Sequence, residues 1–176
     1  VILPEKVDTS KDEKKLVYLS PALLRTNMAA PVIIAAIRNE VSRMVDLVCV
    51  NVGRSFDAVL ENSDEIQNEI DSREECIDFL NKEISFYVSQ CLAASLSEED
   101  AMTLSAIYKI TGNLERMGDH ATNISGYARL LEDKGYKFSD KAIGEVKQMA
   151  EVTNQAASLL HGRDFHGIHV KMAKAE

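Results

Sequence analysis

The chain has 176 residues, 45% of them hydrophobic, which fits one domain with a continuous core. Its formal net charge of -8 argues against nucleic acid as a partner, because the phosphates would be repelled, and favours cations as ligands. All three Pro residues lie within the first 31 positions, so the rest of the chain can form long helices, and we predict an all-α fold.

The beginning of the chain differs in composition from the rest. Residues 1–17 are rich in Lys, Asp and Glu and have little to bury, which predicts a polar linker or tail before a helical domain at 18–176. The sequence starts at Val1 and not at Met, which indicates processing or a segment of a longer protein. Ser20 followed by Pro21 is typical of an N-cap and a first helical position, so a short turn should lead into the first long helix.

Four longer helices follow, at about residues 31–60, 64–96, 98–134 and 139–160. Ser97 with Asp100 has the pattern of a capping box, Gly135 lies where a C-terminal cap belongs, and Ser139 caps the fourth helix. Apolar residues recur every three or four positions and predict the buried stripes, which are Ile33, Ile37, Val41, Met44, Leu47, Val48, Val52 and Phe56 in the first helix, Ile66, Ile70, Ile77, Leu80, Ile84, Tyr87, Cys91 and Ala94 in the second, and Leu104, Ile107, Ile110, Leu114, Met117, Ala121 and Leu131 in the third.

The lengths of these helices predict the shape of the domain. A helix of about 30 residues is about 45 Å long, so three of them joined by short turns form an elongated antiparallel three-helix bundle. Residues 145–152 repeat the pattern of 40–47, with Glu-Val-x-x-Met at the start of each. We therefore expect one complete three-helix unit to about residue 135, and an additional C-terminal helix from about 139 that starts a second unit. This helix has apolar residues to bury, which predicts a homo-oligomer: Ile143, Val146, Met149, Val152 and Ala156.

The three cysteines indicate neither a disulfide framework nor a zinc site. Cys49, Cys76 and Cys91 are odd in number, far apart and without CxxC spacing, so we expect small buried side chains in a reducing compartment. No apolar run approaches the roughly 20 residues that cross a bilayer, and residues 1–15 do not have the pattern of a signal peptide. The chain itself is thus predicted to be soluble.

Paired acidic residues are the main candidates for a ligand site. Glu115 and Asp119 lie one turn apart on one side of the third helix, and Glu74 and Asp78 repeat this spacing beside the buried stripe of the second. Asp71 extends the second pair by one turn. Like-charged carboxylates repel one another unless a cation neutralises them, which favours a metal site between the two helices. From spacing alone, however, a solvated acidic face, neutralised by residues such as Arg116 or Lys109, is the more common interpretation of this pattern.

Other residues near these pairs suggest smaller roles. Gly112 and Gly126 share the side of Glu115, where small residues would let an ion or a backbone approach closely. We expect His120 to be exposed on the opposite side. The remaining histidines, His161, His166 and His169, lack an acidic partner pattern and are not expected to bind metal.

The sequence contains no recognisable catalytic constellation. A Gly-rich phosphate loop, a GxSxG elbow and an HExxH motif are absent, as are the Glu-x-x-His pairs of di-iron bundles. Paired carboxylates hold ions but supply no nucleophile. We therefore predict that the protein is not an enzyme, with a carboxylate-bridged metal enzyme such as an oxidase as an alternative.

Three stretches of the chain resemble a known family. Residues 114–124, LERMGDHATNI, resemble the signature helix of the PhoU family, and residues 74–78, EECID, resemble its second-helix motif. Residues 18–24, YLSPALL, are similar to the junction that follows the membrane domain in sodium/phosphate cotransporter-type proteins, which carry a PhoU-like domain at their C-terminal end.

The resemblance implies a cytosolic bundle that regulates phosphate uptake and holds multinuclear iron or zinc clusters on its acidic motifs. It assigns Glu115 and Asp119 as the first metal ligands, Glu74 and Asp78 as the next, and Asp71 as a lesser one. The implied partner is a membrane phosphate-transporter domain, in the same polypeptide, at the cytoplasmic side of the membrane. A full PhoU protein has two three-helix units, whereas this chain has one complete unit. The alternatives are a free-standing PhoU regulator of a phosphate ABC transporter and its sensor kinase, and a structural helical adaptor.

Overall fold

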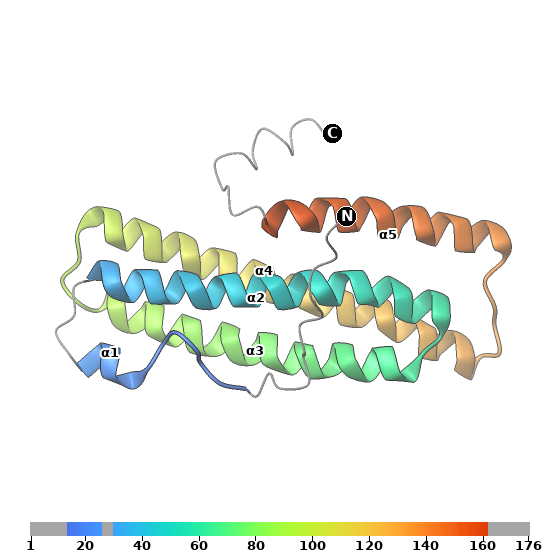
Figure 1. The fold of residues 1–176 in the computed structure, drawn as a ribbon, viewed down its shortest axis with the longest axis horizontal. Helices are drawn as coiled ribbons and strands as arrows, with labels where there is room; N and C mark the ends of the chain where they lie inside the picture. Colours follow the sequence, from blue (N-terminus) through green and yellow to red (C-terminus); the bar gives the residue numbers. More distant parts are fainter. Residues whose placement is uncertain (1–13, 26–29, 162–176) are drawn as a thin grey trace, which may run out of the picture.

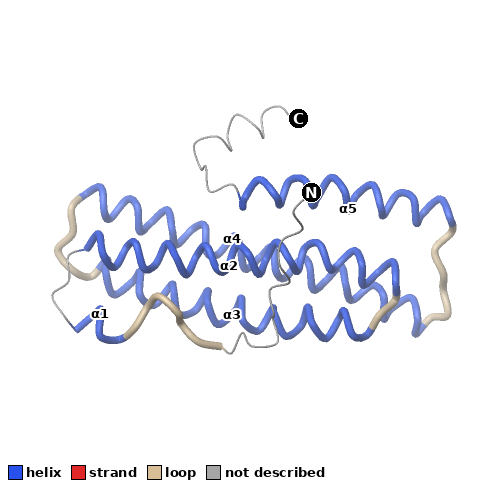
Figure 2. The backbone as a smooth tube through the Cα atoms, in the orientation of Figure 1, coloured by secondary structure: helices blue, strands red, loops and turns tan. Residues whose placement is uncertain are grey.

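The computed structural model describes residues 14–25 and 30–161, and this part of the chain forms helices joined by short turns (Figure 1). The chain order is α1 (Pro21–Arg25), α2 (Ala30–Glu61), α3 (Asp64–Leu92), α4 (Glu98–Asp133) and α5 (Asp140–His161). Figure 2 shows no strand among the described residues, so the all-α prediction is confirmed.

Side chains at the turns determine where the helices begin and end. The Ser97 hydroxyl accepts a hydrogen bond from the Asp100 N–H at 3.1 Å and donates one to the Asp100 carboxylate at 2.8 Å, as the capping-box pattern predicts. Ser139 accepts from the Ala142 N–H at 3.2 Å at the start of α5. Gly135 ends α4 with a φ of 65°, a conformation that glycine adopts without steric cost.

Helices α2, α3 and α4 pack against one another in antiparallel order and form the elongated bundle (Figure 1). Their core is the predicted apolar stripe, and every stripe residue of α2 is buried. Removal of this apolar surface from water supplies the main favourable free energy of the fold. The largest apolar side chains with almost no exposed surface in this core are Ile37, Met44, Ile77, Leu80, Ile84 and Leu104, while Ile70 packs in a separate cluster with Ala58 and Ile66.

Two of the predicted core positions are wrong. Helix α3 ends at Leu92 instead of continuing to residue 96, so Ala94 lies exposed in the turn, where its N–H bonds to the Cys91 carbonyl. Ile110 is 36% exposed because it faces a cavity of about 570 Å³ between α2 and α4, beyond the end of α5. The third-helix stripe is therefore interrupted where no helix covers it.

Helix α5 packs on α2 and leaves part of its own apolar face in solvent. A Cβ at Gly53 of α2 would meet the Asn154 side chain of α5 at 3.2 Å, so the glycine allows the helices to lie close together. One turn before Gly53 on α2, the Cys49 thiol donates a hydrogen bond to the Ala157 carbonyl of α5 at 3.5 Å. Met149 and Val152 remain 61% exposed, so α2 covers only one side of α5.

The ends of the chain lie partly outside the described residues. Residues 1–13 of the predicted linker, His166 and His169 fall in this part, as does the side chain of His161. Residues 14–19 are described, and Leu19 is buried in the core of the bundle. Among the described helices, none is both long and apolar enough to cross a membrane.

Candidate functional site

The carboxylate of Glu74 lies buried between α3 and α4. Both of its oxygens are shielded from solvent and have no hydrogen-bond partner among the described residues. They lie against Gly118 of α4, where an added Cβ would approach Oε2 at 2.5 Å and Oε1 at 3.0 Å. We call this arrangement the Gly118 notch, since the missing side chain of the glycine leaves the space that the carboxylate occupies.

Helical spacing explains why the two residues meet. Glu74 follows Ile70 by four positions and precedes Ile77 by three, so it lies within the buried stripe of α3. Gly118 stands in the same relation to Leu114 and Ala121, which are both buried on α4. An acid in one stripe and a glycine in the other thus face each other across the interface.

Four carboxylates influence one another at this interface. The pKa of Glu74 is raised to about 7, mainly by burial and then by the negative charges of Asp78, Asp119 and Glu115, while the Asn51 amide opposes the shift without reaching hydrogen-bond geometry. These four residues are called the acidic cluster below. Their mutual repulsion makes the ionised state of Glu74 costly without a counter-charge.

The rest of the acidic cluster lies closer to the surface. Burial raises the pKa of Glu115, and Asp119 and Asp78 add to the increase, while Arg116 partly offsets it. Glu115 is half-buried, whereas Asp78 and Asp119 are exposed. The cluster therefore extends from a buried carboxylate outwards to solvent, a path by which an ion could enter.

The structure places Asp71 apart from the acidic cluster. Its carboxylate lies 3.9 Å from the Arg129 guanidinium of α4, which also approaches Asp64 at 3.8 Å. Asp71 is not among the charges that raise the pKa of Glu74. The structure therefore gives Asp71 a basic neighbour, whereas the four cluster residues mainly repel one another.

The donor chemistry of the cluster fits a metal ion that prefers oxygen ligands. Carboxylates bind iron, and zinc accepts them too, so unpartnered Glu74 oxygens beside three further carboxylates are suitable donors. Within the described residues, however, no three His, Cys, Asp or Glu side chains are grouped closely enough to hold one ion. The residues are suitable, and their side chains would have to converge on binding.

The histidine and cysteine side chains that the structure describes are the other candidate ligands. His120 is exposed, as expected, and contributes to a cavity of about 350 Å³ that α2, α4 and α5 line. The three cysteines are free and buried, which confirms that prediction. Burial raises the pKa of the Cys49 thiol to about 11, so this side chain is a neutral thiol at neutral pH in the metal-free protein.

Sequence reasoning identified the carboxylates but missed the residue that creates their environment. An added Cβ at Gly112 or Gly126 would meet no atom within 4 Å, so the expected close approach of another backbone at these two glycines is wrong. Gly118 makes the close approach instead. The signal was available in the spacing of Leu114, Gly118 and Ala121, because a glycine at a stripe position leaves a gap for the facing helix.

Comparison with known proteins identifies the family. The PhoU domain model matches residues 41–128, half of the 176-residue chain, a range that includes all four residues of the acidic cluster. The chain belongs to the PhoU family. This confirms the resemblance found in the sequence motifs, and the helical bundle agrees with it.

A curated PhoU relative matches part of the chain. The phosphate-specific transport system accessory protein PhoU homolog of Aquifex aeolicus (strain VF5) is 31% identical over 98 residues. The match covers 55% of this chain and 44% of the relative, so the chain spans less than half of that protein's length. No solved structure matches the chain.

Proposed function

We propose that this PhoU domain is a regulator of phosphate transport that binds a cation at its acidic cluster and has no catalytic activity of its own. The observation that carries the proposal is the buried, unpartnered carboxylate of Glu74 among three further carboxylates, within the part of the chain that matches the PhoU domain. A bound cation would supply the counter-charge that the described side chains lack.

Iron or zinc is the proposed cation, as the family resemblance implies. Glu115 and Asp119 would contribute from α4, and Glu74 and Asp78 from α3. The exposed Asp78 and Asp119 are able to move inwards towards the buried carboxylate of Glu74. Asp71 is a lesser candidate because it would first have to leave Arg129. Several carboxylates bridging more than one ion would give the multinuclear cluster that the resemblance implies.

The proposed partner is a membrane domain that transports phosphate with sodium, in the same polypeptide and on the cytoplasmic side. The similarity of residues 18–24 to the junction after such a domain supports this context. A free-standing regulator of a phosphate-specific ABC transporter and its sensor kinase is the second candidate. The Aquifex aeolicus relative is named as a phosphate-specific transport system accessory protein, which supports that alternative.

A double substitution tests the cation site and the regulatory role together. We expect Glu115→Ala/Asp119→Ala to lose the bound iron or zinc in elemental analysis of the isolated chain, because two of the four donors are removed. In the full-length protein, the same change should alter phosphate uptake in the same direction as deletion of the domain. Circular dichroism should show both proteins equally helical.

Glu98→Ala/Glu99→Ala is the matched control, since it removes two exposed acids from the first turn of the same helix. It should retain both the metal and normal uptake. Absence of metal from the wild-type chain would remove the cation from the proposal. Phosphate uptake unaffected by deletion of the domain would contradict the regulatory role.

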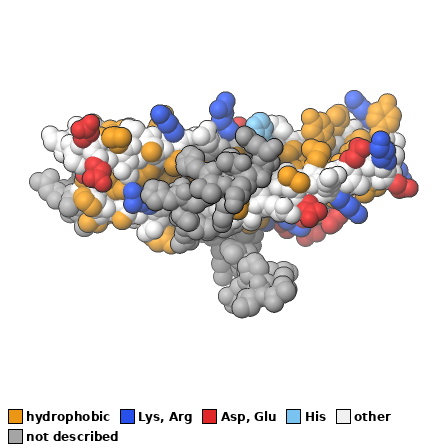
Figure 3. All heavy atoms as spheres, turned by 90° about the horizontal axis from the view of Figure 1, so that it is seen from above, with side chains coloured by type: hydrophobic (Ala, Val, Ile, Leu, Met, Phe, Trp, Pro, Cys, Tyr) orange, Lys and Arg blue, Asp and Glu red, His pale blue; other side chains and the backbone are white. Residues whose placement is uncertain are grey.

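Self-association through α5 is a further part of the proposal. Met149 and Val152 are exposed on this helix, and Figure 3, viewed from the side of α5, shows hydrophobic side chains among charged ones towards one end of the molecule. We expect sedimentation to show a dimer or larger species, and Met149→Glu/Val152→Glu to shift it to monomer without loss of helix. Met102→Glu, at a 68% exposed position of α4, is the control. A wild-type chain that stays monomeric at high concentration would exclude this interface.

A further inference from the structure

Glu40 of α2 is completely buried and binds the backbone of the segment before α1. Its Oε1 accepts hydrogen bonds from the N–H groups of Val17, Tyr18 and Leu19, with distances of 2.7 Å for Tyr18 and 3.4 Å for Leu19. Three consecutive N–H donors therefore converge on one carboxylate oxygen. Hydrogen bonds to an ionised acceptor are the stronger kind, and a buried carboxylate left without them would be costly.

Arg43, one turn further along α2, also binds this segment. Its Nε donates to the other Glu40 oxygen at 3.0 Å, and its Nη2 donates to the Lys15 carbonyl. Glu40 thus accepts hydrogen bonds from the N–H groups of this segment, and Arg43 donates one to a carbonyl of the same segment. The side chains add an apolar contact, since Leu19 is buried in the core and Leu16 packs against it.

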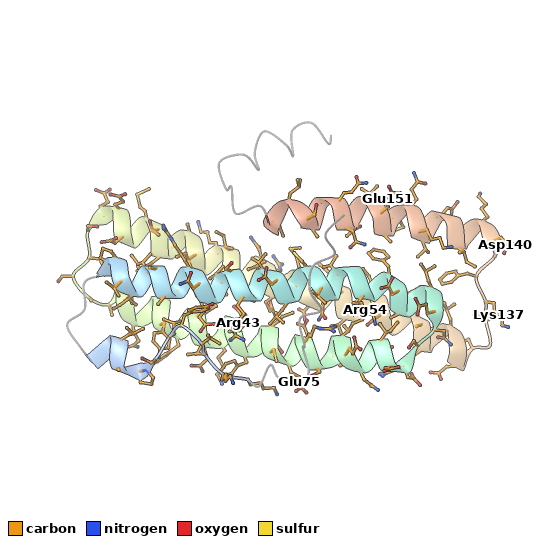
Figure 4. The ribbon with its side chains drawn as sticks, in the orientation of Figure 1. Arg43, Arg54, Glu75, Lys137, Asp140 and Glu151 are labelled. Carbon is orange, nitrogen blue, oxygen red and sulfur yellow. The ribbon has the colours of Figure 1, made fainter. Side chains whose placement is uncertain are left out.

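The segment also reaches α3 beside the acidic cluster. The Lys14 ammonium lies 2.8 Å from the carboxylate of Glu75, and this contact is the main cause that raises the pKa of Lys14. Figure 4 shows Arg43 near the lead-in segment on α2 and Glu75 on the outer side of α3. Residues 14–19, called the strap below, therefore run from Glu75, the residue next to Glu74, to the buried Glu40 and the partly buried Arg43 on α2.

The repeated motif on α5 shows that burial of this glutamate is not a property of the motif itself. Glu145 occupies the position equivalent to Glu40 in the Glu-Val-x-x-Met pattern, yet its side chain is 64% exposed and lies 3.7 Å from Lys141 on its own helix. Glu40 differs because the strap covers it and satisfies it. The residue is therefore specialised for holding the strap.

We propose that the Glu40–Arg43 pair is a latch that locks residues 14–19 onto the bundle and thereby couples the PhoU domain to whatever precedes it in the chain. The coupling rests on the regulatory function proposed above, whereas the latch itself does not. Release of the strap would leave a buried carboxylate without its donors, so intermediate positions are disfavoured and the segment is either bound or released. Movement of the segment before the strap would then release the strap and expose the Glu40 carboxylate of α2 in one step.

Amide hydrogen exchange on the 176-residue chain tests the latch. The Val17 and Tyr18 amides should be protected in the wild type and exchange about tenfold faster in Glu40→Gln, because a charged acceptor becomes a neutral one. Glu40→Ala should increase the rate further, and Glu145→Gln is the matched control that should change nothing in the strap. Amides in the middle of α3 report whether each variant stays folded. Equal exchange of the strap in Glu40→Gln and wild type would overturn the latch.

Phosphate uptake by the full-length protein tests the coupling. Glu40→Gln should reproduce at least half of the change in uptake that deletion of the domain causes, while Glu145→Gln should not. If deletion changes uptake but the unlatched Glu40→Gln does not, the latch carries no signal and the coupling is wrong. If deletion has no effect, the proposed function and the coupling both fail, and the exchange experiment still decides whether the latch exists.

Discussion

Replacing Glu74 with Gln is expected to stabilise the metal-free protein at pH 8 and to have almost no effect at pH 4. The pKa of Glu74 is raised from 4.5 to about 7 in the folded chain, mainly by burial and then by Asp78, Asp119 and Glu115. The ionised carboxylate is therefore less stable in the folded chain than in the unfolded one. Gln fills nearly the same volume and cannot ionise, so it removes that penalty.

The direction of the pH dependence follows from the proton count in each state. Below pH 4.5 Glu74 is mostly protonated in both the folded and the unfolded state, so its burial does not lower the free energy of unfolding. Between about 4.5 and 7 the folded state keeps the proton that the unfolded state loses, so stability falls as pH rises. Above 7 the loss is constant, at most about 3 kcal/mol, and we expect about 2 because the residue as a whole is only half-buried, although its carboxylate oxygens are shielded.

Urea denaturation in a chelating buffer at pH 4, 6 and 8 measures this difference. Glu65→Gln is the control on the same helix, since Glu65 is exposed in the first turn of α3, where a negative charge favours the helix N-terminus. That substitution should destabilise the chain slightly at pH 8, by up to about 1 kcal/mol, which is the opposite sign. A Glu74→Gln variant that is less stable than wild type at pH 8 would mean that the carboxylate has a stabilising partner.

The bundle was predictable because its signals are local. Residues three and four apart share a helix face, so the stripes of α2 and α3 could be read directly, and caps such as Ser97 and Gly135 mark the ends. The end of α3 was missed because Ala93 and Ala94 are good helix formers, and spacing does not reveal where the chain must turn. Exposure of Ile110 depends on which helix covers it, and this is a tertiary property.

The site was predictable in part for the same reason. Angular position on each helix placed Glu74, Asp78, Glu115 and Asp119 at the α3–α4 interface, and the electrostatic coupling among them agrees with that placement. The contact between Asp71 and Arg129 depends on how far the two helices slide past each other, which no local pattern specifies.

Glu40 illustrates a different limit of local reasoning. Glu40 follows Ile37 by three positions and precedes Met44 by four, so the helical pattern already places it in the buried stripe. Its hydrogen-bond partners lie 21 to 23 residues earlier in the chain, so the pattern gave no sign of what satisfies its carboxylate. A carboxylate in a bundle can be buried when backbone donors from a distant segment satisfy it.

Gly118→Ala is expected to be less stable than its control Gly112→Ala by about 1 to 3 kcal/mol, although both replace a helical glycine with alanine. Alanine favours a helix by about 1 kcal/mol, and at Gly112 an added Cβ meets no atom within 4 Å, so that substitution should stabilise the chain. At Gly118 the Cβ would overlap with the Glu74 carboxylate, which must either stay compressed or leave the notch.

A double-mutant cycle with Glu74→Ala isolates this contact. The three atoms nearest to a Cβ at Gly118 all belong to the Glu74 carboxylate, so without that carboxylate Gly118→Ala loses its tightest contacts and should stabilise the chain by about 0.5 to 1 kcal/mol, as at Gly112. Urea denaturation at pH 8 measures the coupling energy between the two positions. Gly118→Ala should lower the free energy of unfolding when Glu74 is present and raise it when Glu74 is replaced by Ala. If Gly118→Ala stabilises the chain equally with and without Glu74, the carboxylate does not occupy the Gly118 notch. A coupled result together with weaker metal binding in Gly118→Ala would mean that the glycine holds Glu74 where a cation can reach it, which explains why a residue unfavourable to helices lies in the buried stripe of α4.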